Sequence, residues 1–212
     1  MLRMAVMVLR FWMPKYVVCL CAGMAASLAL PPAGIVPALF LFSPVFYFAA
    51  NALTAWVAGL YIGLSSLGWF IASLYWIGSS LFVDGGMQLL LLPFVCLLFP
   101  LFLALFWATG AAVSFRAFSS PSVRLIGFII CLGCADYLRS VVLTGFPWNV
   151  TAHAFLESFV LAQGAAFVGQ HGLNFLALSL IVAPIFIMQR RFSLTAVCLL
   201  PFVLCFILSA DR

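Results

Sequence analysis

Long apolar stretches, each closed by polar residues, glycines or prolines, make up most of this chain. Their lengths suit membrane-crossing helices, for which about 20 apolar residues span the hydrocarbon layer. The first stretch reaches only ~22 Å as a helix, so a tilted or non-spanning entry stays open for it. We expect seven helical spans, at residues 16–30, 33–50, 54–83, 87–115, 125–143, 164–187 and 192–209.

Glycine and proline mark where these segments turn. Pro31-Pro32 separates the first two segments, and Asp84–Gly86 forms a turn with the residues that turns prefer. Pro93 and Pro100 fall inside a predicted span. Neighbouring helices can accommodate prolines in a bilayer, so we keep residues 87–115 as one span.

Composition confirms that the chain is not a water-soluble domain. Hydrophobic residues make up 67% and charged residues 6%, and the mean hydropathy is +1.32. In soluble domains roughly a quarter of the residues are charged. A chain of this length buries at most about three quarters of its unfolded surface, so it could not hide so many apolar residues from water. We therefore predict an all-α polytopic membrane protein, a bundle of about seven transmembrane helices.

The few charges indicate how the bundle is oriented. Short cytoplasmic loops carry an excess of Lys and Arg. With the N-terminus in the cytoplasm, the inner segments hold Arg3, Arg10, Lys15, Arg116, Arg124, Arg190 and Arg191. The outer segments then hold Asp84, Glu157, Asp211 and Arg212. The expected order is a basic cytoplasmic N-terminus at 1–15, a transmembrane domain at 16–209 and a periplasmic C-terminal end at 210–212.

An acid and an arginine stand one helical turn apart near the outer end of the fifth span. Asp136 and Arg139 are spaced i, i+3, so one helix face carries both, and pairing lowers the cost of each charge in hydrocarbon. Arg139 also lies close enough to the outer end to extend toward headgroups. Two interpretations stay open: a structural pair at a helix end, and contact with a lipid phosphate or polar substrate.

The run Gly145-Phe146-Pro147-Trp148 predicts a stiff turn within a periplasmic loop at 144–156. Pro147 fixes its own φ and moves Phe146 out of the helical region, and Gly145 permits a conformation that other residues resist. The turn is either an interfacial aromatic anchor or one wall of a lipid-chain pocket that opens outward.

No metal, cofactor or nucleic acid is expected from these patterns. Cys131-x-x-Cys134 lies inside an apolar span without a second ligand pair. His153 and His171 have no Cys or carboxylate constellation near them in sequence. The nine basic residues form no contiguous patch, which argues against a nucleic-acid partner.

Several motifs in register resemble the apolipoprotein N-acyltransferase family. Each motif alone is weak, but Thr-Gly-Phe-Pro-Trp between an upstream acid-x-x-Arg and a downstream Gly-Leu-x-Phe is fairly specific. The matching residues are Ser73–Leu81, Asp136–Arg139, Leu143–Asn149, Gln163 and Val168–Leu176. The chain has Asp136 where the family usually has Glu, Tyr137 where it has Trp, and His171 where it often has Tyr. Val150–His153 stands where the family pattern often ends in Gly-Tyr.

The resemblance implies an enzyme of the bacterial inner membrane. The family has eight spans and a nitrilase-like periplasmic domain between the last two. A cysteine of a Glu-Lys-Cys triad takes an acyl chain from a phospholipid donor, then passes it to the diacylglyceryl-cysteine of a lipoprotein acceptor. The thioester divides one difficult transfer into two easier ones.

The triad has no counterpart in this sequence, where Lys15 is the only lysine and Glu157 the only glutamate. We expect no catalytic residue here, and residues 210–212 as the truncated start of the missing periplasmic domain. The expected form is truncated or split, is inactive alone and partners a separately encoded nitrilase-like domain. The alternatives are a small secondary transporter and a non-catalytic membrane subunit. The residues expected to contact lipid or substrate are Asp136, Arg139, Phe146, Pro147, Trp148 and Asn149.

Overall fold

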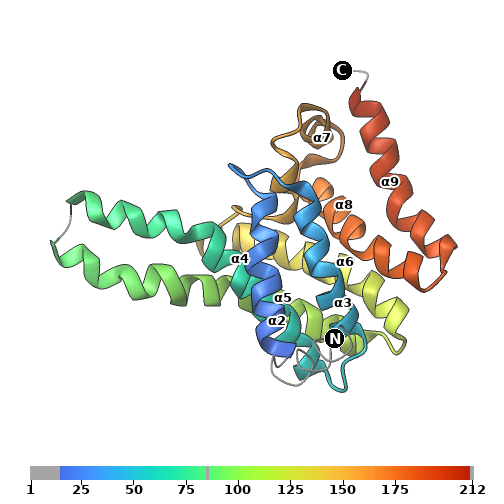
Figure 1. The fold of residues 1–212 in the computed structure, drawn as a ribbon, viewed down its shortest axis with the longest axis horizontal. Helices are drawn as coiled ribbons and strands as arrows, with labels where there is room; N and C mark the ends of the chain where they lie inside the picture. The colour runs from blue at the N-terminus through green and yellow to red at the C-terminus, as the bar shows by residue number, and fades with distance from the viewer. Residues whose placement is uncertain (1–14, 85, 211–212) are drawn as a thin grey trace, which may run out of the picture.

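The computed structural model describes residues 15–84 and 86–210, and all regular structure in these ranges is helical (Figure 1). The predicted all-α class is confirmed. The longer elements are α2 (Lys15–Ala26), α3 (Phe42–Ala50), α4 (Ala55–Asp84), α5 (Phe99–Ala117), α6 (Pro121–Val141), α7 (Phe159–Gln163), α8 (Ala165–Met188) and α9 (Phe192–Ala210). The short elements are η1 (Ser27–Ala29), η2 (Val36–Leu41), η3 (Gly86–Leu91), the π-helix η4 (Phe94–Leu98), η5 (Val142–Thr144) and η6 (Thr151–Phe155).

Each of the seven predicted apolar segments is helical over most of its length. Among the described residues, four helical stretches are long and apolar enough to cross a membrane, namely 55–83, 86–117, 121–144 and 165–188. Three more apolar stretches, 15–29, 36–50 and 192–208, are shorter. The apolar helices are consistent with a membrane protein, whereas seven spans and their orientation stay predictions. Arg3, Arg10, Asp211 and Arg212, on which the orientation partly rests, lie outside the described residues.

The predicted span at 87–115 is divided into three helical pieces, η3, η4 and α5. The π-helix η4 follows Pro93 directly, and Pro100 lies in the first turn of α5. Proline lacks the N–H that continues a regular helix, so the segment changes its hydrogen-bond pattern next to Pro93 instead of running as one α-helix.

Aromatic rings fill the centre of the bundle. Phe42 of α3 lies with its ring centroid 5.5 Å from that of Trp69 and 5.6 Å from that of Trp107. Phe46 continues the cluster toward Phe128 of α6, at 5.8 Å. All five rings are buried, so α3, α4, α5 and α6 share one core.

Helices α2 and α4 cross at very close range through two glycines. A Cβ atom on Gly23 of α2 would meet the carbonyl oxygen of Ser65, and one on Gly68 of α4 would meet that of Leu20. Small residues let helix backbones approach in membranes, where dispersion contacts replace the hydrophobic effect. This crossing holds α2 directly against α4.

The far half of α4 and the start of the 86–117 stretch form a hairpin that extends away from the other helices (left in Figure 1). Its large apolar side chains are exposed, among them Phe82, Met87, Phe94 and Leu97. The hairpin base meets the turn after α6, so the candidate site lies where the arm joins the bundle.

Candidate functional site

The turn after α6 has an unusual backbone. Leu143, Thr144 and Gly145 have φ values of 52°, 74° and 82°, and Asn149 has 55°. A Cβ atom on Gly145 would collide with the carbonyl oxygen of Ser140, so no larger residue fits there. Non-glycine residues in this region each cost energy and persist only where surrounding contacts hold them.

Arg139, in the last turn of α6, supplies those contacts. Its Nη1 donates to the carbonyl oxygens of Phe146 at 2.7 Å and Trp148 at 2.8 Å. The backbone N–H of Phe146 in turn donates to the carbonyl oxygen of Arg139 at 2.9 Å. Arg139 is 2% exposed, with its guanidinium carbon 5.0 Å from the centroid of the Phe70 ring. The side chain therefore turns inward and does not extend toward headgroups.

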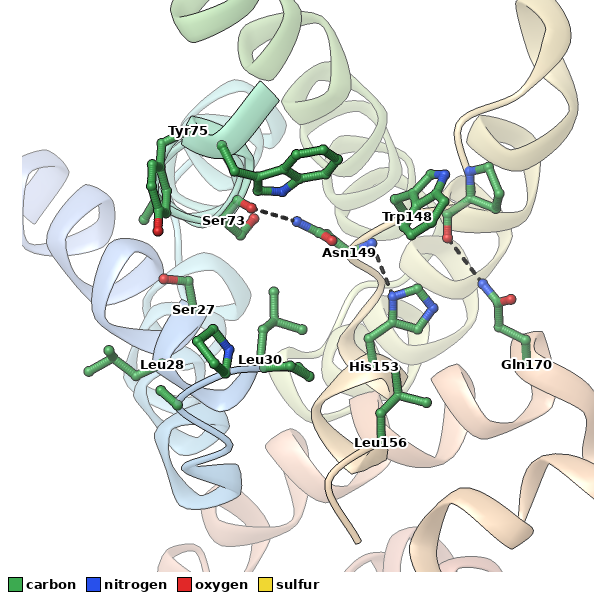
Figure 2. A pocket seen from close by; sticks show the side chains of 16 residues that line it. Ser27, Leu28, Leu30, Ser73, Tyr75, Trp148, Asn149, His153, Leu156 and Gln170 are labelled. Carbon is green, nitrogen blue, oxygen red and sulfur yellow. Dashed lines mark hydrogen bonds between the residues drawn. The ribbon is translucent and has the colours of Figure 1, made fainter. Parts of the chain in front are cut away.

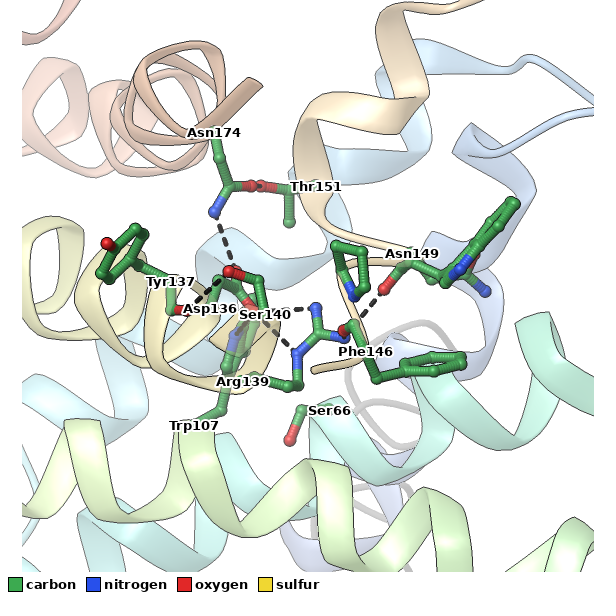
Figure 3. Close-up of polar contacts among 12 residues, drawn as sticks. Ser66, Trp107, Asp136, Tyr137, Arg139, Ser140, Phe146, Asn149, Thr151 and Asn174 are labelled. Carbon is green, nitrogen blue, oxygen red and sulfur yellow. Dashed lines mark hydrogen bonds and ion pairs between the residues drawn. The ribbon is translucent and has the colours of Figure 1, made fainter. Parts of the chain in front are cut away.

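Asp136 is the centre of a buried polar network that joins four elements (Figure 3). Its Oδ1 accepts from Arg139 Nη2 at 3.0 Å and from Trp107 Nε1 of α5 at 3.0 Å. Its Oδ2 accepts from Asn174 Nδ2 of α8 at 2.8 Å. Asn174 Oδ1 then accepts from the Thr151 hydroxyl of η6 at 2.6 Å. Every charged group in the network is paired and hydrogen-bonded, as burial of an ion pair requires.

Asn149 fixes the far side of the turn against α4. Its Nδ2 donates to the carbonyl oxygen of Ser73 at 3.1 Å, and its own carbonyl oxygen accepts from Trp69 Nε1 at 2.8 Å. Its backbone N–H donates to Nδ1 of His153 at 3.1 Å. Asn149 therefore links the turn to α4 on one side and to η6 on the other.

A cavity of about 810 Å³ opens beside this turn (Figure 2). Its walls come from the stretches 27–33, 72–76 and 147–156, together with Gln170 of α8. Most lining side chains are apolar or aromatic, such as Leu30, Trp76 and Trp148, and none carries a formal charge. Gln170 is held in the wall by its Nε2, which donates to the carbonyl oxygen of Pro147 at 3.1 Å.

The predicted site residues divide between the network and the cavity. Pro147, Trp148 and Asn149 line the cavity. Asp136 and Arg139 lie behind it in the buried network, and the Phe146 ring packs edge-on against Phe99 with centroids 4.9 Å apart. The structure therefore brings the six residues to one region but gives them two kinds of surroundings.

Sequence reasoning missed several members of both groups. Trp107 and Thr151 belong to the network, and Ser73 and Gln170 belong to the cavity or its wall. Ser73, Gln170 and Asn174 all fall in the stretches that carry the family resemblance, which was an available signal. No sequence signal pointed to Trp107, because its indole N–H reaches Asp136 only once α5 packs against α6.

His153 is half-buried between the cavity and the network. Burial lowers the pKa of His153 below its ordinary value of 6.5, and the nearby Arg139 charge lowers it further, while Asp136 acts in the opposite direction. The ring is therefore neutral at pH 7.

Comparison with known sequences places this arrangement in a family. The sequence model of the apolipoprotein N-acyltransferase N-terminal domain matches residues 22–183. The chain belongs to this family. The matched region runs from α2 into α8, so it includes the whole polar network and the cavity.

Curated relatives agree. The apolipoprotein N-acyltransferase of Rhodopseudomonas palustris is 33% identical over 179 residues, which cover 80% of this chain and 33% of that protein. That of Brucella melitensis is 31% identical over 189 residues, 83% of this chain and 35% of that protein. That of Caulobacter vibrioides is 32% identical over 183 residues, 81% of this chain and 33% of that protein. The chain thus spans about a third of the length of the curated relatives it matches.

Proposed function

We propose that this chain is the membrane portion of an apolipoprotein N-acyltransferase and that its cavity holds the acyl part of a lipid substrate. The observation that carries the proposal is an uncharged, mostly apolar cavity of about 810 Å³ beside a rigid turn. Ligand cavities of this kind have volumes of ~300–1,000 Å³, with apolar walls and a few polar groups that orient the ligand. Phospholipid and diacylated lipoprotein are the substrates that this chemistry fits.

The role we assign to this portion is positioning, in the bacterial inner membrane. Acyl transfer through a thioester needs a nucleophile with an adjacent base. Lys15, at the start of α2, packs near Phe48, and no other lysine occurs in the sequence. We therefore assign the chemistry to a nitrilase-like domain and the alignment of the two lipid-bearing substrates to this portion. Holding reactants in register removes much of the entropic part of a barrier.

Family membership favours this function over a secondary transporter. The remaining alternative, a non-catalytic membrane subunit, differs from our proposal only in how the catalytic domain is supplied. Both assign lipid contact to the same cavity.

The proposal can be tested by grafting this chain in place of the corresponding membrane region of a full-length relative. The chimera is expressed in cells depleted of their own enzyme, and N-acylation of a lipoprotein is read by mass spectrometry of its N-terminal peptide. We expect the chimera to acylate and Trp148→Ala to reduce acylation severalfold, because the indole forms part of the cavity wall.

Trp56→Ala is the matched control, because Trp56 is 75% exposed at the start of α4 and does not line the cavity. It should acylate like the unmodified chimera at equal membrane levels. Acylation by this chain alone would refute the positioning role. Equal activity of the Trp148 and Trp56 variants would remove the cavity from the mechanism.

A further inference from the structure

We propose that His153 is a specificity-determining residue of the cavity, which donates a hydrogen bond from Nε2 to the ester carbonyl oxygen of a bound lipid. This inference rests on the proposed function and names the polar group that the cavity recognises. It follows from how the ring is held, from which of its atoms are used, and from the absence of charge in the cavity walls.

The hydrogen bond from Asn149 selects the tautomer of the ring. The backbone N–H of Asn149 donates to Nδ1 of His153 at 3.1 Å (dashed in Figure 2), so Nδ1 must carry a lone pair. A neutral imidazole that accepts at Nδ1 carries its proton on Nε2. His153 therefore offers one donor, on the nitrogen that Asn149 does not use.

That donor has no partner in the part of the chain that the structure describes. Among the hydrogen bonds of residues 15–84 and 86–210, none involves Nε2 of His153, although the side chain lines the cavity. Nor is Nε2 among the fully buried side-chain atoms that lack a partner in that part of the chain. A donor placed in a cavity wall in this way is free to meet a ligand.

The surroundings favour an uncharged acceptor. Phosphate sites normally use Arg or Lys, and none lines this cavity. Arg139 lies nearby, but its guanidinium group donates its hydrogen bonds to Asp136, Phe146 and Trp148. An ester carbonyl fits these surroundings, because it accepts a hydrogen bond and has no formal charge. In a phospholipid it lies at the junction between the acyl chain and the glycerol.

Two substitutions separate the two ring nitrogens. His153→Asn places an amide oxygen near the Nδ1 position, which keeps the acceptor for Asn149 but removes the donor to the ligand. His153→Gln reaches the Nε2 position with an amide N–H, which keeps the donor. Both remain neutral, so a difference between them reports the donor and not the charge.

The test is competition between diacyl phosphatidylcholine, which has ester carbonyls, and its dialkyl ether analogue of equal chain length, which has none. Binding of each to the full chain in detergent micelles is measured by native mass spectrometry. We expect the wild type to prefer the ester lipid by roughly two- to tenfold, as one neutral hydrogen bond allows. The preference should vanish in His153→Asn and persist in His153→Gln.

Different failures have different meanings. Equal binding of both lipids by the wild type, or an ester preference that survives in His153→Asn, would overturn the role of His153 and leave the lipid cavity standing. Absence of binding of either lipid to the wild type would overturn the lipid cavity itself. Repeating the competition with diacyl phosphatidylglycerol, which keeps the ester carbonyls and the phosphate but has another headgroup, tests for a headgroup contact. A His153-dependent preference between headgroups, in place of one between ester and ether, would also overturn the inference.

Discussion

Arg139 forms four hydrogen bonds, all within the protein, and thereby holds a strained turn and a buried acid at once. Of the two interpretations that the sequence leaves open, these contacts favour a structural pair. A contact between Arg139 and lipid stays a prediction. The residues that line the cavity, Trp148 and Asn149, are better placed for that role.

Arg139→Ala tests this assignment. It removes the counter-ion of Asp136 and the support of two turn carbonyls, so we expect the free energy of unfolding to fall by about 3–5 kcal/mol. The measurement is the fraction of protein that stays monodisperse after heating in detergent. A variant of unchanged thermal stability that no longer binds lipid would show instead that Arg139 acts on the ligand.

His153 makes the stability of the turn depend on pH. Its folded-state pKa lies below the ordinary 6.5, so the unfolded chain binds the proton first as the pH falls. Stability is therefore full above pH ~6.5 and declines as the pH drops below that value toward the folded pKa. Protonation also removes the Nδ1 acceptor that Asn149 uses.

The check is the melting temperature at pH 7.5 and pH 5.5, with His153→Asn as the reference because it keeps an acceptor and does not titrate. We expect the wild type to lose more thermal stability on acidification than this variant. His171 is present in both proteins, so any contribution from it cancels in the comparison. An equal loss in both proteins would contradict the prediction.

At the scale of elements, the reciprocal contact of Gly23 and Gly68 sets how close α2 and α4 approach. Gly68→Ala would push the Leu20 carbonyl oxygen away and separate the helices, at a cost of about 1–3 kcal/mol, the range for overpacking. Gly78→Ala on the same helix is the control, because its new methyl meets the Sγ atom of Cys96 and a methyl of Leu92, which can rotate away. We expect Gly68→Ala to lower the thermal stability in detergent more than Gly78→Ala does. Equal losses would mean that the crossing tolerates a methyl group.

The elements were largely predictable from local pattern, whereas their connections were not. The apolar segments and the Gly145–Trp148 turn follow from hydropathy and from glycine and proline, which act on neighbouring residues. The network around Asp136 depends on partners 29 and 38 residues away, Trp107 and Asn174. No local pattern announces that an indole or an amide on another helix will face the acid. The continuous stretch at 86–117 agrees with the single span predicted at 87–115. The change of helix type next to Pro93 could not be predicted, because a bilayer helix can accommodate a proline in several ways.

At the scale of the whole molecule, the network and the cavity lie at one end of α6. Asp136 and Arg139 occupy its last turns, and the basic residues Arg116 and Arg124 lie at or before its other end. If basic loops face the cytoplasm, the cavity faces the periplasm. The lipid cavity would then open on the side where the family resemblance puts the catalytic domain.

Cysteine labelling in intact cells tests that sidedness. Glu157→Cys and Ser119→Cys place thiols at exposed positions, beyond the turn and before α6 respectively. A membrane-impermeant maleimide added to cells with a permeabilised outer membrane should label Glu157→Cys, and Ser119→Cys only after lysis. The unsubstituted chain measures the background from its own seven cysteines. Labelling of Ser119→Cys alone would invert the topology and place the cavity on the cytoplasmic side, where it could not serve a periplasmic catalyst. Labelling of both from outside would mean that α6 does not cross the membrane.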